Sequence, residues 1–416
     1  MKPNSKVSFK QILWLMDEKC KIDWPTLSKK ESKVLNANMF CHSEVYGFIG
    51  TVCPNCGTQR IHYGSCNTSG CLECGVVRKE KWLDKQRRKI VKAPYHHIVF
   101  TIPHQLNELF LAHRKTTGNL FFQAVAEALK TISADPKYFG ATKIGFFEVE
   151  HTWGAALNWH PHRHVVLCGA GLDDAGNLVY PKYETQKPAS GKKKGFIFPA
   201  KKLAALFKKI LLNKLCEKFE YTGSPWLNDL NTVKEISWQI QICEALSKPD
   251  SIIDYLGRYV NRTAISNSRI QSYDGEHVMF TYKSYRNNGK IMKMTLKDTE
   301  FLRRFTMHIP PEHYTRIRYY GFLGPNGKKD LEKIQQLTGT PPAPEVRTTE
   351  EILMTLMGEN YNKCPKCAET MEVEIEEPRI RKISEHFSRL RKIARRADIQ
   401  GLVVPKLMDY NQSAKD

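Results

Sequence analysis

The feature that most constrains the fold is a concentration of cysteine between residues 53 and 74. Five of the twelve cysteines lie there, as the pairs Cys53/Cys56 and Cys71/Cys74 with Cys66 between them. Two sulfurs three positions apart in a tight turn can hold one metal ion, and two such turns complete a tetrahedron. The fourteen residues between the pairs fall just outside the usual zinc range of about 15–20. We predict a closed, structural Zn²⁺ site rather than buried unliganded thiols.

Other potential ligands leave the number of zinc ions open. Cys66 and His62 can replace one of the four cysteines or, with Cys41 or His42, form a second site. The segment Cys364-Pro-Lys-Cys367 is half a site without a matching pair nearby. It binds a metal only if distant residues complete the set, or it binds none.

The charge balance points to a polyanionic partner. The chain has 64 lysines and arginines against 43 acidic residues, a net charge of +21. Such an excess favours nucleic acid, because each neutralised phosphate releases counterions. Basic residues concentrate in two runs, 182–214 and 379–396. Two runs of one sign indicate nucleic acid more strongly than solubilising surfaces or an anionic membrane.

Nothing in the sequence suggests a membrane or secretory protein. No window has the roughly 20 uninterrupted apolar residues of a membrane span. The polar segment Met1 to Lys10 lacks the apolar core of a signal peptide. We expect a cytoplasmic protein with no membrane partner, and twelve cysteines in that setting argue against a disulfide framework.

The pattern along the chain predicts an α+β fold. Residues 1–50 and 78–92 are expected to be helical, as are 106–132 and 200–218. Short β runs occupy 97–102, 143–150, 164–168 and 278–283, with a meander at 144–168. Strands and helices mixed in this way favour an antiparallel sheet with flanking helices. We divide the chain into a helical and zinc-binding region (1–92), a catalytic domain (93–325) and, after the Pro-Pro-Ala-Pro linker at 341–344, a basic C-terminal region within 326–416.

A histidine-rich strand predicts a second kind of metal site. His162 and His164 alternate with Arg163 and so point to one face of a strand. A hairpin would return His151 beside them as a third ligand. His160 has the same parity, although Pro161 makes that end of the strand irregular. Three protein ligands leave positions open for a phosphate oxygen, as a catalytic metal requires.

Two tyrosines follow on a predicted helix. Tyr255 and Tyr259 lie four positions apart and share one face, and Gly257 lies between them. A glycine within a helix costs about 1 kcal/mol relative to alanine and leaves room for a close approach. A tyrosine hydroxyl can attack a phosphodiester if a metal polarises the phosphate.

Several ordered motifs resemble one known family, the two-tyrosine HUH transposases of bacterial insertion sequences. The resemblance covers roughly residues 40–325. It rests on Cys66 with Cys71-x-x-Cys74, on Tyr95 to Pro103, on His151-Thr-Trp-Gly with His160 to His164, on Tyr255 to Ser266, and on Phe301 to Gly321. One departure is Arg163, which occupies the hydrophobic middle position of His-hydrophobic-His.

The resemblance implies an HUH endonuclease domain with a central antiparallel sheet. It further implies Mg²⁺ or Mn²⁺ at the histidines, although three imidazoles by themselves would suit zinc better. Tyr255 and Tyr259 would then cut single-stranded DNA at element ends and in the target through a 5′-phosphotyrosine, in a protein associated with the bacterial nucleoid. Arg163, Arg258 and Arg262 are candidate DNA contacts.

Three alternatives remain open at this stage. The same chemistry serves plasmid replication initiators and relaxases. A zinc-dependent DNA-binding protein with a decayed site would form no covalent adduct, and a metal-dependent hydrolase would release 5′-phosphate ends. The sequence does not specify the DNA recognised, the first nucleophile or the oligomeric state.

Overall fold

The computed structural model describes residues 7–182, 197–221, 223–243, 252, 257, 263–284, 287–358, 362–378 and 391. Two compact units form, residues 1–74 with 362–416, and residues 75–361. Each unit is described here by itself. The expected division into 1–92, 93–325 and 326–416 stays a prediction. In the part of the chain that the structure describes, no helix is both long and apolar enough to cross a membrane.

The first unit combines two helices with a small sheet, β13-β1-β2. Its elements are α1 (Phe9–Glu18), α2 (Lys29–Phe40), β1 (Phe48–Val52), β2 (Gln59–Tyr63) and β13 (Glu372–Glu377). Each helix begins with a capping box, in which a serine hydroxyl and a Gln or Glu side chain each accept a hydrogen bond from a free backbone N–H. Strand β13 pairs antiparallel with β1, although more than 300 residues separate them in sequence.

The second unit is built on a five-stranded sheet of order β12-β4-β5-β3-β8, antiparallel throughout. Its strands are β3 (Tyr95–Thr101), β4 (Gly145–Trp153), β5 (Trp159–Cys168), β8 (Ile240–Ile242) and β12 (Ile317–Gly321). Two further sheets pair β6 (Gly171–Leu172) with β7 (Leu178–Val179), and β10 (His277–Ser284) with β9 (Ile270–Tyr273) and β11 (Lys290–Lys297). The α+β fold with a central antiparallel sheet is confirmed.

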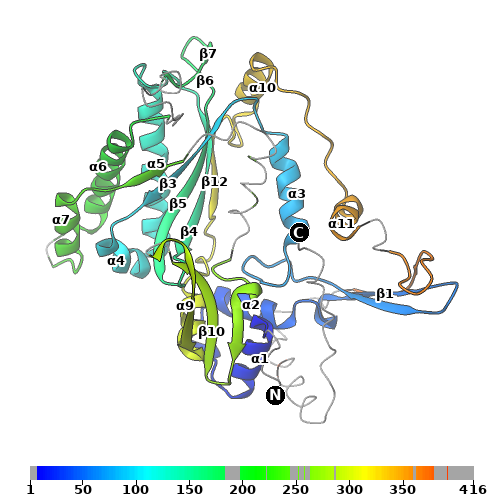
Figure 1. Cartoon of the computed structure of the whole chain (residues 1–416). Helices are drawn as coiled ribbons and strands as arrows, with labels where there is room; N and C mark the ends of the chain where they lie inside the picture. Colours follow the sequence, from blue (N-terminus) through cyan, green and yellow to red (C-terminus); the bar gives the residue numbers. More distant parts are fainter. Residues whose placement is uncertain are drawn as a thin grey trace. The chain divides into compact units, whose positions relative to one another are not determined.

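Helices cover both faces of this sheet (Figure 1). The helices of the unit are α3 (Val76–Arg87), α4 (Asn107–Ala112), α5 (Arg114–Ala134), α6 (Ala200–Phe219), α7 (Leu227–Glu235), α9 (Asp298–Thr306), α10 (Lys328–Leu337) and α11 (Thr349–Met357). The larger core packs α5 and α6 against the face that carries Phe100 and Val165. A second core packs Leu83 of α3 and Ile252 against the face that carries Val149 and Val166. Side chains alternate along a strand, so His162 and His164 share the face of Val166.

Candidate functional site

Three histidines converge on the face of the central sheet opposite α5 and α6. His151 on β4 lies directly across from His162 on β5, and His164 follows two residues later on the same face. One ring nitrogen from each lies within 4.8 Å of the others. His151 is buried and the other two are half-buried. His160 does not belong to this group, so the geometry selects His151 as the third potential ligand.

Hydrogen bonding orients His162 toward the group. Its Nδ1 lies 2.7 Å from the carbonyl oxygen of His160. A carbonyl only accepts, so Nδ1 carries the proton and Nε2 keeps its lone pair. Partners of this type fix the tautomer of metal-binding histidines. The irregular start of β5 therefore supplies an orienting group rather than a ligand.

His97 on β3 orients His164 and is a residue that sequence reasoning missed. His97 Nε2 lies 2.9 Å from His164 Nδ1, and the two rings are inclined by only 14°. The Nδ1 of His97 lies 3.3 Å from the sulfur of Cys243. Burial lowers the pKa of His97 to about 4, so its ring is neutral at pH 7. The available signal was parity: residue 97 shares its face of β3 with residue 99, which lies opposite His164.

The end of the β4–β5 hairpin is held by His308, which the sequence also did not single out. Its Nε2 lies 3.2 Å from the carbonyl oxygen of Leu157, and its Nδ1 lies 3.1 Å from the hydroxyl of Thr152. Its ring stacks on Trp159 at an interplanar angle of 3°. Burial lowers the pKa of His308 to about 3. A neutral histidine thus closes the hairpin next to His151.

Arg163 is not a DNA contact, which corrects the expectation from the sequence. Its side chain is fully buried on the face opposite the histidines. Its guanidinium pairs with Glu150 at 2.5 Å, donates to the carbonyl oxygen of Gly118 at 2.9 Å, and lies over the rings of Phe121 and Phe122. An arginine can occupy this position because a carboxylate and two aromatic faces replace water.

The cysteines form two four-membered groups rather than the one expected. Cys53 and Cys56 do not meet Cys71 and Cys74. The structure instead forms one group of Cys41, Cys66, Cys71 and Cys74, and another of Cys53, Cys56, Cys364 and Cys367. The first CxxC turn connects β1 to β2, and β2 separates it from the second turn, so each turn takes its partners from elsewhere in the fold. The single-site grouping was wrong, and the open alternatives involving Cys41 and distant ligands describe the arrangement.

The first group, site A, is enclosed by helix α2 and the loop that follows β2. Cys41 is the residue that ends α2, and Cys41, Cys66 and Cys71 are buried. The backbone N–H groups of Cys66 and Thr68 point at sulfurs 3.5 and 3.4 Å away. Such donors stabilise thiolate, the form that binds zinc. Four sulfurs with no open position indicate a structural site.

The predicted tyrosine helix falls largely outside the described residues. Tyr255, Tyr259, Arg258 and Arg262 lie outside them, as do residues 183–196 of the first basic run and all of the second run except Arg391. Two neighbours are described. Ile252 is buried in the core on the histidine face of the sheet. A Cβ at Gly257 would lie 2.8 Å from Lys79 and 3.4 Å from Leu83, both of α3, so this glycine permits a close helix contact.

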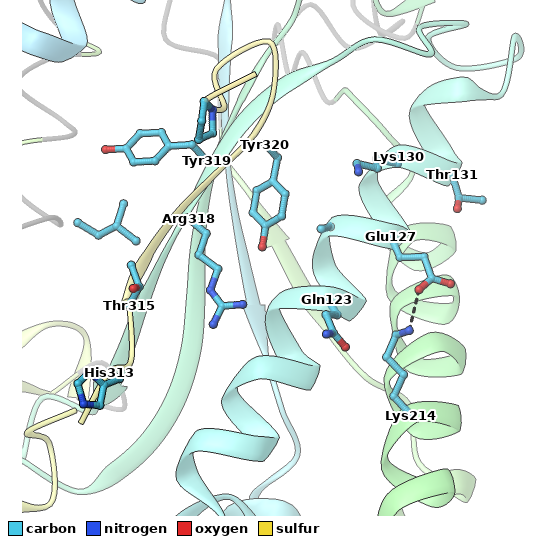
Figure 2. Close-up of a pocket in the computed structure, with 13 residues that line it drawn as sticks. Gln123, Glu127, Lys130, Thr131, Lys214, His313, Thr315, Arg318, Tyr319 and Tyr320 are labelled. Atoms are coloured by element: carbon cyan, nitrogen blue, oxygen red, sulfur yellow. Dashed lines mark ion pairs between the residues drawn. The ribbon is translucent and has the colours of Figure 1, made fainter. Parts of the chain in front are cut away.

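A cavity of about 830 Å³ opens beside the edge strand β12 (Figure 2). Arg318, Tyr319 and Tyr320 line it from β12, and Lys130 and Lys214 line it from α5 and α6. Lys214 forms an ion pair with Glu127 at 2.9 Å. None of the three clustered histidines lines it. Arg318 and Tyr320 point toward the α5 side of this cavity, whereas the ring of Tyr319 points to the opposite side (Figure 2).

Comparison with known proteins finds family matches in two regions of the chain. Residues 145–330 match a family described as a putative transposase, and residues 15–102 match a transposase zinc-binding domain. A putative transposase of Sinorhizobium fredii is 33% identical over 370 residues, which is 84% of this chain and 90% of that protein. The transposase for insertion sequence element IS801 of Pseudomonas savastanoi pv. phaseolicola is 27% identical over 70% of each chain. No solved structure matches.

Proposed function

This chain belongs to the two-tyrosine HUH transposases of bacterial insertion sequences, and from that premise we propose that it cuts and rejoins single DNA strands through a phosphotyrosine. The observation that carries the proposal is the convergence of His151, His162 and His164 on one face of the central sheet. Ile252, three residues before Tyr255, packs on that same face. The three histidines and Ile252 thus share one side of the sheet, which supports a tyrosine nucleophile close to the histidines.

The three imidazoles fit a divalent cation. Each ligand nitrogen must keep its lone pair, and the carbonyl of His160 imposes that state on His162. When bound, such a cation polarises a phosphate oxygen and stabilises the charge that develops on it. Ligand softness alone favours zinc or another transition metal. Membership in this family favours Mg²⁺ or Mn²⁺, and we propose that one of these two ions binds here.

The tyrosines perform the covalent chemistry in this scheme. The hydroxyl oxygen of Tyr255 or Tyr259 bonds to the scissile phosphorus, and the bond to the 3′ oxygen breaks. The products are a 5′-phosphotyrosine and a 3′-hydroxyl, which receives a proton. Attack by a 3′-hydroxyl of another strand reverses the step and restores the tyrosine. The phosphotyrosine conserves the bond energy, so joining needs no nucleotide cofactor, and the second tyrosine serves the second cleavage.

Charge and zinc support a DNA substrate. The net charge of +21 favours phosphate backbones. We propose that single-stranded element ends and target DNA bind on the histidine face of the sheet by phosphate contacts and stacking. Site A holds structural Zn²⁺ and shapes the N-terminal module that positions the DNA.

The decisive experiment detects a covalent protein–DNA adduct on a denaturing gel. Labelled single-stranded element ends are incubated with Mg²⁺ or Mn²⁺ and wild-type protein, Tyr255→Phe, Tyr259→Phe, the double variant or His162→Ala. We expect the adduct to disappear in the double tyrosine variant and in His162→Ala, and the single variants to rank the nucleophiles. Cleavage without adduct would indicate a water-using hydrolase. Binding with neither cleavage nor adduct would indicate a DNA-binding protein with a decayed site.

A matched pair of histidine variants tests the ligand set. His151→Ala should abolish the adduct, because it removes one of three converging nitrogens. His160→Ala lies on the same strand but keeps the backbone carbonyl that orients His162. Its rate of adduct formation should therefore stay within about threefold of wild type, which is less than the roughly tenfold change that corresponds to 1.4 kcal/mol. Equal loss in both variants would show that His160 is also required.

A further inference from the structure

The second cysteine group, Cys53, Cys56, Cys364 and Cys367, lies in two turns of the same design. Both turns have the sequence Cys-Pro-x-Cys. In each turn, the residue after the second cysteine donates its backbone N–H to the carbonyl oxygen of the first cysteine at 2.9 Å. These donors are Gly57 and Ala368. Both residues have positive φ, 68° and 59°. Two turns that repeat one hydrogen-bond pattern present their sulfurs in the same way.

The sulfurs of the two turns face one another at metal-binding distances. Cys53 lies 3.4 Å from Cys367, Cys56 lies 3.5 Å from Cys364, and Cys367 lies 3.6 Å from Cys56. Four sulfurs about 2.3 Å from one zinc ion lie about 3.8 Å apart. A disulfide would need about 2.05 Å, and all four cysteines are free. These distances suit four sulfur ligands around one zinc ion.

The small sheet that carries these turns has almost no apolar core. All six residues of β13 are exposed, and four of them are glutamates. The buried cluster beside the sheet consists of Cys53, Cys364 and Met371, with Cys367 packed against it. Three strands need a hydrophobic face or an equivalent constraint to be stable. In small modules a structural metal supplies that free energy.

We propose that these four cysteines, here called site B, bind a second structural zinc ion that fastens the C-terminal segment to the N-terminal hairpin. The ion closes a loop across 308 positions, from Cys56 to Cys364. An independent contact points the same way: Arg391 lies 3.8 Å over the ring of Trp24 and 3.9 Å from Asp17. Arg391, a member of the basic run, therefore lies against the N-terminal module. The matched zinc-binding family covers residues 15–102 and contains only half of this site.

The two zinc sites differ in access. Cys56 of site B is exposed, whereas Cys41, Cys66 and Cys71 of site A are buried. A chelator must reach the sulfurs to compete for the ion, so site B releases its zinc faster. The inference does not depend on the phosphotyrosine chemistry, because it concerns different residues and is tested without DNA.

The test measures zinc content and zinc release in the full chain. Wild type is compared with Cys364→Ser/Cys367→Ser, with Cys71→Ser of site A, and with Cys20→Ser, an exposed cysteine outside both groups. We expect each of the first two variants to lose one zinc per chain and Cys20→Ser to lose none. With a chelating dye, wild type should release zinc in a fast and a slow phase, and the double variant should lack the fast one.

Two further results complete the test. Cys367→His, which retains a zinc-binding side chain, should restore the zinc count that serine removes. Limited proteolysis should cut the C-terminal segment of the double serine variant at least tenfold faster than in wild type. An unchanged zinc count in that variant overturns the proposal. If the double serine variant unfolds and loses all its zinc, its zinc count no longer tests the proposal. The wild-type release then decides, and a single release phase would overturn the proposal.

Discussion

At the residue scale, Arg163 shows how a charged side chain can occupy a buried motif position that is usually hydrophobic. The middle residue of the His-x-His strand faces the larger core, where a hydrophobic side chain would be expected. Arginine is accommodated by Glu150, by the carbonyl of Gly118 and by two aromatic rings. Removing one partner of a buried ion pair leaves the other charge uncompensated.

We therefore predict that Arg163→Met lowers the free energy of unfolding by about 3–5 kcal/mol, because it leaves the Glu150 carboxylate buried and unpaired. The double variant Arg163→Met/Glu150→Leu should recover most of that loss. Urea denaturation of the three proteins measures the difference. DNA affinity per folded molecule should not change, and a drop in affinity at constant stability would contradict the buried role.

Glu148 provides a pH-dependent prediction at the same scale. It is fully buried, and burial raises its pKa well above the usual value despite the opposing effect of Arg163 and Arg318. A carboxyl whose pKa is higher in the folded state stabilises the fold below its unfolded pKa of about 4.3 and loses that contribution as pH rises toward the folded pKa.

Glu148→Gln removes this titration. The variant should be more stable than wild type at pH 7, and the difference should shrink toward pH 4.5. Thermal unfolding of both proteins across that range measures it. A stability difference that does not depend on pH would show that Glu148 keeps an ordinary pKa in the folded state.

At the scale of elements, helix α5 approaches the sheet at a glycine. A Cβ at Gly118 would lie 2.2 Å from the hydroxyl oxygen of Tyr314 and 2.9 Å from its Cζ. The same glycine offers its carbonyl to Arg163. Alanine would improve helix propensity by about 1 kcal/mol, but the overlap forces α5 away from its partners.

We predict that Gly118→Ala destabilises the protein by about 1–3 kcal/mol, the range for overpacking, although propensity alone predicts a gain. Lys115→Ala, at an exposed position of the same helix, is the matched control and should be neutral. Thermal unfolding compares the two. A stabilised Gly118→Ala would mean that the helix and Tyr314 separate readily.

At the scale of the whole molecule, the two units depend on different stabilising forces. Residues 75–361 have two apolar cores of their own, whereas the unit of residues 1–74 and 362–416 combines buried apolar side chains of α1 and α2, such as Phe9, Leu13 and Leu35, with both cysteine groups. Structural zinc contributes its binding free energy directly to folding.

Removing zinc with a strong chelator should therefore unfold the small sheet of the first unit and leave the second unit folded. Hydrogen exchange followed by peptide mass analysis should show lost protection in β1, β2 and β13, and retained protection in β3, β4 and β5. Re-addition of Zn²⁺ under reducing conditions is the control and should restore protection. Loss of protection in both units together would contradict separate stabilisation.

The sequence by itself determined the features that depend on neighbours along the chain. Alternation in a strand placed His162 and His164 on one face, and the hairpin brought in His151. The form Cys-x-x-Cys predicted sulfur-bearing turns, and β periodicity predicted the antiparallel sheet, because each depends on local backbone geometry. The transposase family was likewise recognised from ordered motifs and confirmed by the comparisons.

Only the tertiary structure decided which distant groups meet. It joined Cys53 and Cys56 to Cys364 and Cys367 rather than to Cys71 and Cys74. It placed His97 against His164, and it buried Arg163. No local sequence pattern specifies which two CxxC turns share a metal ion. No local pattern shows that an arginine is buried against a carboxylate rather than exposed to solvent. Partner choice follows from strand pairing and packing across hundreds of residues, where desolvation and contact with the whole fold set the free energy.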